Sequence, residues 1–213
     1  MAQKVLVLGA TPYTEVFIDM FRALPDVNFV ACVTNHKRED TALNLAGLSV
    51  LWHEDIHHMT SSHLLICMLG TARRRNWIEQ MAQAQFDFTT LVHPSSVVSA
   101  RTPLSPGVSI DAGCVIAGYS KIFDHVRIGR NVSVGHHTEI GPYATLHPGS
   151  IVSGNCRIGT QTTIGTGSVI IDGLTIGDGA FVAAGAVVTK NVPPRAMVAG
   201  NPAQIKRVDY GPI

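Results

Sequence analysis

The sequence has little charge and almost no excess of either sign. Charged residues make up 15% of the 213 residues, and 16 lysines and arginines nearly balance 15 aspartates and glutamates, so the formal net charge is +1. A nearly neutral chain lacks the electrostatic footprint of proteins that bind nucleic acids or anionic membranes. We therefore expect no nucleic acid and no membrane among its partners, and we favour small molecules.

Long apolar runs and closely spaced cysteines are also missing. No apolar run approaches the roughly 18 residues of a membrane-spanning helix, and the first residues, MAQKVLVLGATPYTEVF, do not have the pattern of a signal peptide. The four cysteines lie far apart with no CxxC, at Cys32, Cys67, Cys114 and Cys156. This spacing is typical of free, buried thiols, and these absences together predict a cytoplasmic protein.

Residues 1–90 alternate short apolar runs with helix-like stretches. The apolar runs KVLVLG, NFVACVTN, LSVLW and HLLICMLG end in turns, and two further stretches, TEVFIDMFRAL and ARRRNWIEQMAQAQ, have helical patterns. Such alternation is typical of βαβ units, in which helices connect parallel strands. We predict a small α/β domain with a parallel sheet over residues 1–90.

The remainder of the chain repeats every six residues. An aliphatic residue stands at every sixth position from Val92 to Val188, and a mostly small residue follows each of them four positions later. Only Leu174 among the second set is bulky, and no insertion breaks the seventeen copies. Each repeat forms a short strand and a turn that can bury its inner face only against its neighbours. The period therefore predicts a β-helix over residues 91–213.

Glycines recur at the position directly after the aliphatic residue. They stand at Gly129, Gly135, Gly141, Gly159, Gly165 and Gly177. Glycine reaches backbone conformations with φ above zero at little cost. We therefore interpret these glycines as turn residues with positive φ.

The repeat block and the C-terminal stretch VAAGAVVTKNVPPRAMVAGNPAQIKR resemble the hexapeptide-repeat acyltransferases. Residues 1–207 are similar to their sialic-acid O-acetyltransferase/sugar-nucleotide N-acetyltransferase subgroup, in which a small Rossmann-like domain precedes the β-helix. The stretch LVHPSSVVS at the junction is also typical of this subgroup. The resemblance implies a left-handed parallel β-helix with three hexapeptides per coil. It further implies a homotrimer with sites between subunits and acetyl-CoA as co-substrate.

Three histidines lie in the stretch VGHHTEIGPYATLHPG, residues 134–149. The resemblance implies that His136, five residues before Gly141, is the catalytic base. Imidazole suits this role because its ordinary pKa of about 6.5 leaves it mostly neutral at pH 7. The acid that usually follows the base is replaced by His137, so we expect His137 or the nearby Glu139 to support it. A solvated turn histidine without a catalytic role is the alternative.

The resemblance also implies a groove for coenzyme A between neighbouring β-helices. Gly154 stands 18 residues, one coil, after His136, so we expect the two to stack about 4.8 Å apart. Gly154 would then donate its N–H to the thioester carbonyl, unless it is merely a turn glycine. The further expected cofactor contacts are Thr145, His147, Ala183, Ala184 and Lys190, with the alanines along the pantetheine and the lysine near a phosphate.

The loop GATPYT follows the first apolar run and corresponds to the sugar-nucleotide loop of the resembling enzymes, although it keeps only Gly9 of their glycines. Thr11 and Pro12 have the types of a helix cap and first helical residue, and a helix N-terminus attracts anions. A dinucleotide site is not expected, because the second and third glycines of GxGxxG are absent. The further expected substrate contacts are Tyr13, Asn35, Gly70, Thr71 and Arg75.

A zinc site is the competing interpretation of the histidines. The γ-type carbonic anhydrases use the same β-helix, with two ligands of one chain five residues apart. In this chain His125, His136, His137 and His147 are separated by eleven, one and ten residues. Catalytic zinc needs three convergent protein ligands. We therefore predict that no metal is required.

These observations predict an acetyl-CoA-dependent N-acyltransferase that acts on a nucleotide-linked amino sugar. The amine would attack the thioester directly, with His136 as general base. Residues 1–90 would bind the sugar nucleotide and residues 91–213 would form the acyltransferase domain. Two alternatives stay open: O-acetylation of a sugar hydroxyl with the same base, and a non-catalytic trimeric binding protein, which the altered loop and His137 do not exclude.

Overall fold

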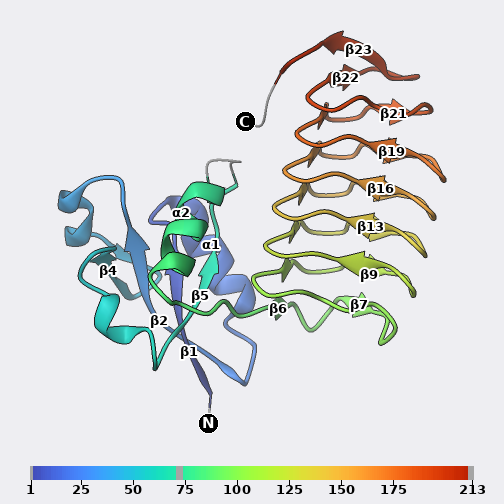
Figure 1. The fold of residues 1–213 in the computed structure, drawn as a ribbon. Coiled ribbons are helices and arrows are strands. Elements are labelled where there is room, and N and C mark those ends of the chain that lie inside the picture. Colours follow the sequence, from blue (N-terminus) through green and yellow to red (C-terminus); the bar gives the residue numbers. More distant parts are fainter. Residues whose placement is uncertain (1, 71–73, 211–213) are drawn as a thin grey trace. The chain divides into compact units, whose positions relative to one another are not determined.

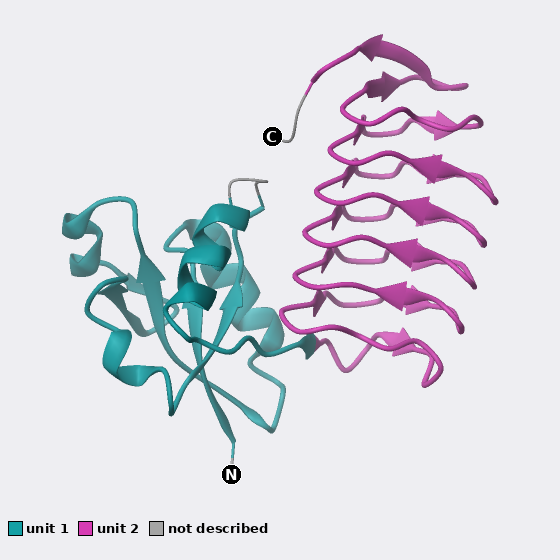
Figure 2. Cartoon of the chain, in the orientation of Figure 1, with its two compact units in different colours: residues 1–91 teal, residues 92–213 magenta. Residues whose placement is uncertain are grey.

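The computed structural model describes residues 2–70 and 74–210. The chain divides into two compact units, Met1–Leu91 and Val92–Ile213 (Figure 2). Each unit has its own cluster of buried hydrophobic side chains. No helix in the described ranges is long and apolar enough to cross a membrane.

The first unit is built on a five-stranded sheet in the order β3-β4-β2-β1-β5 (Figure 1). All neighbouring strands are parallel except the β3–β4 pair. The strands are β1 (Gln3–Leu8), β2 (Val27–Thr34), β3 (Asn44–Leu45), β4 (Leu48–Trp52) and β5 (Leu64–Cys67). The helices are α1 (Pro12–Phe21), η1 (Arg38–Ala42), η2 (His57–Met59) and α2 (Arg74–Gln83). The predicted α/β domain is confirmed, and its four apolar runs form β1, β2, β4 and β5.

The expected alternation of strands and α-helices holds at β1 and β2 and again at β5, which α2 follows as predicted, but it fails between β2 and β4. Helix α1 connects β1 to β2 and buries Phe17, Ile18 and Phe21. The connection from β2 to β4 contains the short 3-10 helix η1, none of whose residues is buried, and strand β3. A segment with no apolar stripe cannot cover a sheet face, so it stays short and irregular.

The second unit consists of short strands in three parallel sheets, with β23 added antiparallel at the end. Paired strands lie 18 residues apart, as in Ser133↔Ile151 and Val134↔Val152, so three hexapeptides form one coil. The four-stranded sheet contains β10 (Lys121–Ile122), β13 (Glu139–Ile140), β16 (Arg157–Ile158) and β19 (Thr175–Ile176). The six-stranded sheet contains β7 (Val97–Val98), β9 (Val115–Ile116), β12 (Ser133–Val134), β15 (Ile151–Val152), β18 (Val169–Ile170) and β21 (Val187–Val188). The eight-stranded sheet contains β6 (Leu91–Val92), β8 (Ser109–Ile110), β11 (Arg127–Ile128), β14 (Thr145–Leu146), β17 (Thr163–Ile164), β20 (Phe181–Val182), β22 (Met197–Ala199) and β23 (Gln204–Arg207).

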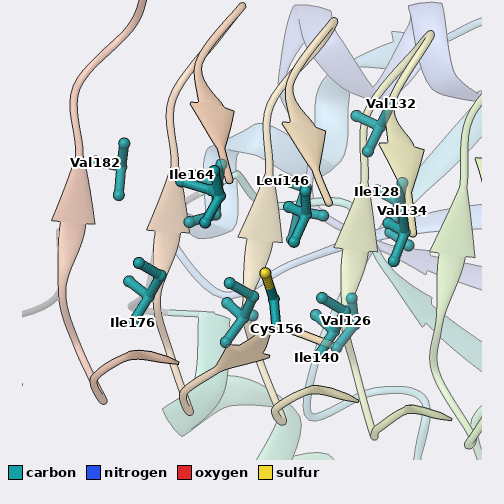
Figure 3. Packing of buried hydrophobic residues seen from close by; sticks show 14 of the residues in the cluster. Val126, Ile128, Val132, Val134, Ile140, Leu146, Cys156, Ile164, Ile176 and Val182 are labelled. Atoms are coloured by element: carbon teal, nitrogen blue, oxygen red, sulfur yellow. The ribbon is translucent and has the colours of Figure 1, made fainter. Parts of the chain in front are cut away.

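The repeating aliphatic residues fill the interior of the coils (Figure 3). From Ile110 to Val188 each of them is buried, and the small residues four positions later lie beside them. Hydroxyl groups at these small positions donate to carbonyls 15 residues ahead, as Thr138 Oγ1 does to Ser153 O at 3.0 Å and Ser120 Oγ to Gly135 O at 2.8 Å. A small side chain is required because it fills the inner corner and satisfies a buried carbonyl.

The interpretation of the repeat glycines as positive-φ residues is wrong. Positive φ occurs two positions later in the repeat, at residues such as Tyr119, His137 and Asn155. The glycines directly after the aliphatic residue are required by close approach of the next coil. A Cβ on Gly135 or Gly165 would lie under 3.0 Å from backbone atoms of that coil, so any larger residue would push the coils apart.

Candidate active site

His136 and His137 lie in the turn between β12 and β13. Both side chains are exposed, and His137 has a φ of 55°, in the left-handed region. The pairing of β12, β15, β18 and β21 stacks the turns that follow these strands into one corner of the β-helix. We call this column of turns, which contains residues 136–137, 154–155, 172–173 and 190, the histidine corner.

The imidazole of His136 lies against Gly154 in the next coil. The backbone of the two turns is joined by a 2.8 Å hydrogen bond from Asn155 N to His136 O. A Cβ on Gly154 would lie 2.8 Å from His136 Cε1 and 3.0 Å from Nε2. The predicted stacking of these two residues is therefore present, and only glycine leaves room for the ring.

The N–H of Gly154 is open to a ligand. Among the described residues it donates to no protein acceptor, and the corresponding residue of other repeats, such as Thr166, has the same property. The open N–H thus follows from the turn geometry, and the imidazole of His136 beside it distinguishes Gly154. A backbone donor next to a potential base is the arrangement that acyl transfer requires.

His137 contacts His136 through the ring nitrogens. The two Nδ1 atoms are 3.1 Å apart and the rings are perpendicular, at 84°. The ring of Tyr119, one coil earlier, stacks on His137, with the ring centroids 5.1 Å apart and an interplanar angle of 16°. Arg101 places its guanidinium 5.4 Å from the centroid of Tyr119. The sequence analysis missed Tyr119, although its 18-residue spacing from His137 could have identified it.

The side chain of Glu139 forms ion pairs away from the histidines. It lies on β13, and its carboxylate forms ion pairs with Lys121 at 3.2 Å and Arg157 at 3.1 Å, on the two neighbouring coils. In the described part of the chain no contact joins this carboxylate to His136 or His137. The group that contacts the candidate base is therefore the second imidazole.

The expected cofactor residues lie at two separate corners of the same β-helix. Lys190 is exposed in the histidine corner, three coils beyond His136. His147 and the alanine pair Ala183 and Ala184 lie in turns that follow the eight-stranded sheet, and Thr145 begins β14 of that sheet. Within one chain these four residues are therefore not gathered around His136.

The first unit contains a cavity of about 360 Å³ at the carboxyl ends of β1 and β2. Three of the expected substrate residues line it, namely Gly9, Thr11 and Asn35. The other lining residues are Ala10, Thr34, His36, Asp40, Leu69 and Trp77. In open α/β sheets this edge is where ligands bind.

The remaining expected substrate residues have other positions. Thr11 caps α1 and Pro12 is its first residue, as predicted, while Tyr13 is 39% exposed on the helix. Gly70 is exposed, and Arg75 forms an ion pair with Glu79 on α2 at 2.7 Å. None of Pro12, Tyr13, Gly70 and Arg75 lines the cavity. Thr71 lies outside the described residues.

Sequence reasoning missed four polar residues of the cavity, Thr34, His36, Asp40 and Trp77. Asp40 Oδ2 lies 3.5 Å from His36 Nδ1 and 3.4 Å from Thr34 Oγ1. Trp77 is 4% exposed, and its Nε1 has no hydrogen-bond partner in the described part of the chain. His36 and Asp40 could have been identified from the sequence, because an acid stands four residues after a histidine directly after a predicted strand. For Trp77 the sequence offered no such signal.

The four cysteines are free and buried, as expected. Burial, with a smaller effect from Glu15, raises the pKa of Cys32 to about 11, and burial also raises the pKa of Cys114 and Cys156. Thiols in this state are poor nucleophiles. Among the described residues no group of three or more His, Cys, Asp or Glu side chains is placed to hold a metal ion.

Comparison with known proteins relates both units to transferases. Residues 119–154 and 155–190 match the family "bacterial transferase hexapeptide (six repeats)". The search of curated proteins gave no match.

Among solved structures, PerB from Caulobacter crescentus in complex with CoA and GDP-perosamine is 29% identical, with a TM-score of 0.87, covering 97% of this chain and 99% of that one. The acetyltransferase domain of PglB from Neisseria gonorrhoeae FA1090 in complex with acetyl coenzyme A is 27% identical, with a TM-score of 0.87, covering 96% and 100%. WeeI from Acinetobacter baumannii AYE, at 24% identity and a TM-score of 0.77, shares the fold over 96% and 100%.

These likenesses extend over both units of the chain. The fold is accordingly a small Rossmann-like α/β domain followed by a left-handed parallel β-helix of hexapeptide repeats, as expected. The resemblance found in the sequence is confirmed: the β-helix of this chain carries the hexapeptide repeats of the bacterial transferases.

Proposed function

We propose that the chain is an acetyl-CoA-dependent N-acyltransferase that modifies a nucleotide-linked amino sugar. The observation that carries the proposal is the imidazole of His136 against the backbone of Gly154, in a β-helix of transferase hexapeptide repeats. Similarity over 96% or more of the chain to structures holding CoA with GDP-perosamine, or acetyl coenzyme A, supports the two substrates.

His136 and Gly154 can divide the chemistry of acyl transfer between them. The substrate amine attacks the thioester carbonyl carbon, and His136 Nε2 accepts the proton that the amine nitrogen loses as the C–N bond forms. The N–H of Gly154 donates to the oxyanion of the tetrahedral intermediate. When the C–S bond breaks, the sulfur of coenzyme A takes up this amine proton from His136, so the base is restored.

The cavity of the first unit is the proposed sugar-nucleotide site. Gly9 and Thr11 stand at the N-terminus of α1, where backbone N–H groups and the helix dipole favour the negative diphosphate. Asn35 and the carboxylate of Asp40 line the same cavity and can bond the hydroxyl or N–H groups of a nucleoside. The second unit would then provide the acetyl-CoA site.

A homotrimer would complete the acetyl-CoA site. His136 lies at one corner of the β-helix and Thr145, His147, Ala183 and Ala184 lie at or beside another, so a second copy of the chain is needed to bring the two sets together. The outer face of the six-stranded sheet carries exposed apolar side chains, with Val97 at 65%, Val115 at 50% and Ile151 at 44% exposure. Apolar surface of this kind is typical of subunit interfaces.

A thiol-release assay tests the proposal. Purified protein is incubated with acetyl-CoA and a panel of nucleotide-linked amino sugars, each matched by the hydroxy sugar with the same nucleotide. We expect release of coenzyme A with an amino sugar, loss of release in His136→Ala, and formation of an amide. Release with the hydroxy sugars instead would assign O-acetylation, and absence of turnover on every member would contradict the proposed activity.

A further inference from the structure

The contact between His136 and His137 has only two neutral hydrogen-bonding arrangements. With Nδ1 facing Nδ1 at 3.1 Å, one nitrogen carries the proton and the other accepts it. If His136 donates from Nδ1, its Nε2 has a free lone pair. If His137 donates, His136 must carry its proton on Nε2, and it cannot accept another there. The two arrangements therefore correspond to a competent and an incompetent base.

We infer that His137 is a positioning residue that selects the base-competent tautomer of His136 by accepting the Nδ1–H of His136 at its own Nδ1. The inference rests on the proposed function, in which His136 Nε2 takes the substrate proton. An imidazole here performs the orienting part of the role that a carboxylate performs in other base-acid pairs. It does so without adding a negative charge.

The structure fixes the ring of His137 for this purpose. Its backbone is in the left-handed region, and its backbone N–H donates to Gly118 O with an N···O distance of 3.3 Å. Its ring stacks on Tyr119 at 16°, and Tyr119 in turn lies under the Arg101 guanidinium. Aromatic contacts of this geometry restrict ring rotation and stabilise the pair. Tyr119 therefore holds the accepting nitrogen towards His136.

In the described part of the chain, no hydrogen bond or ion pair joins a carboxylate to His136 or His137. Glu139 on the next strand is bound to Lys121 and Arg157. Asp172 lies in the histidine corner one coil beyond Gly154, and no bond joins it to either histidine in the described part of the chain.

The arrangement predicts how the pair behaves during turnover. When Nε2 of His136 takes the amine proton, the ring becomes cationic and its Nδ1–H becomes a charge-assisted donor to neutral His137, so the contact strengthens. The proton then leaves from Nε2 to the sulfur of coenzyme A.

Imidazole ¹⁵N spectra test the inference without relying on activity. In the ¹⁵N-histidine-labelled full chain at pH 8 we expect His136 to show the Nδ1–H pattern, assigned by its loss in His136→Ala. His137→Asn and His137→Asp keep an oxygen acceptor and tolerate positive φ, so the pattern should persist. His137→Gly removes the acceptor without backbone strain, and the Nε2–H pattern, which free histidine favours, should appear.

Kinetics of the same variants provide the second readout. His137→Gly should lower the turnover number by about 3- to 10-fold, the effect of one neutral hydrogen bond, and His137→Asn should restore most of it.

Variants of Tyr119 form a matched pair. Tyr119→Phe keeps the stacked ring and should keep the Nδ1–H pattern of His136, and Tyr119→Ala should weaken it. An Nε2–H pattern for His136 in the wild type, or a tautomer unaffected by His137→Gly, would overturn the inference even if His136→Ala abolishes activity. If His136→Ala keeps its activity, the proposed function fails instead, so the two failures are distinguishable.

Discussion

The imidazole of His136 lies against the Cα of Gly154, although the two residues are a full coil apart in sequence. This contact places a potential base beside a backbone N–H that no protein group uses in the described part of the chain. The first two predictions follow from it.

Replacing the base should remove most of the activity. We expect His136→Ala to lower the turnover number by about 10²- to 10⁴-fold, the usual contribution of a positioned general base, with coenzyme A affinity nearly unchanged. His137→Ala should cost much less. Retention of more than about a tenth of the activity, or greater damage from His137→Ala, would show that the base is misplaced.

Filling the space under the imidazole should displace it. A Cβ in Gly154→Ala would lie 2.8 Å from His136 Cε1, so the ring must move. We expect the turnover number to fall by about 10²-fold, because a displacement of about 1 Å at a reacting group has this effect. Gly47→Asn is the control, since Gly47 has positive φ and open space around its Cα. Steady-state kinetics measure the turnover number of both variants. An unchanged turnover number in Gly154→Ala would argue against the stacked geometry in solution.

A charge on the apolar face should prevent assembly. We expect the wild type to sediment as a trimer and Ile151→Asp to sediment as a smaller species, because a buried unpaired carboxylate is costly at an interface. Thr175→Asp, on the exposed outer face of the four-stranded sheet, is the matched control and should remain trimeric. A wild type that is monomeric at micromolar concentration would remove the intersubunit site.

The two units should bind different substrates. Residues 90–213 contain an unbroken core of their own, and the cavity of the first unit is formed before residue 80. We expect this fragment to stay folded and to bind coenzyme A while losing affinity for the sugar nucleotide. Calorimetry with both ligands measures this, and nucleotide affinity equal to that of the full chain would place the substrate in the second unit.

The stability of the protein should depend on pH through Asp111. Its Oδ1 is buried without a hydrogen-bond partner in the described part of the chain, and burial raises its pKa despite the opposing charges of Arg127, Arg130 and His93. Because the folded-state pKa exceeds the unfolded one, the group favours folding below its ordinary value, and this contribution is lost as pH rises through the folded pKa. Asp111→Asn stays neutral throughout. Its melting temperature should exceed that of the wild type near pH 7, and the difference should shrink towards pH 3; a difference independent of pH would refute the assignment.

The sequence alone determined the architecture because that architecture is periodic. The six-residue period predicted stacked coils, and the resemblance to the hexapeptide-repeat acyltransferases implied three repeats per coil, so the stacking of His136 on Gly154 followed from counting 18 residues. The strands of the first unit were equally visible, since β1 is a continuous apolar run buried within a parallel sheet.

Only the tertiary structure decided which side chains meet across these coils and loops. The 18-residue spacing places Tyr119 beside His137, and Glu139 between Lys121 and Arg157. The direction of each side chain depends on its rotamer and its surroundings, so only the fold decided that the rings stack and that the ion pairs form. The cavity of the first unit joins Gly9, Asp40 and Trp77 across irregular segments that follow no period. The sequence showed that glycines recur directly after the aliphatic residue. They are required by the close packing of neighbouring coils, which exists only after the chain has folded.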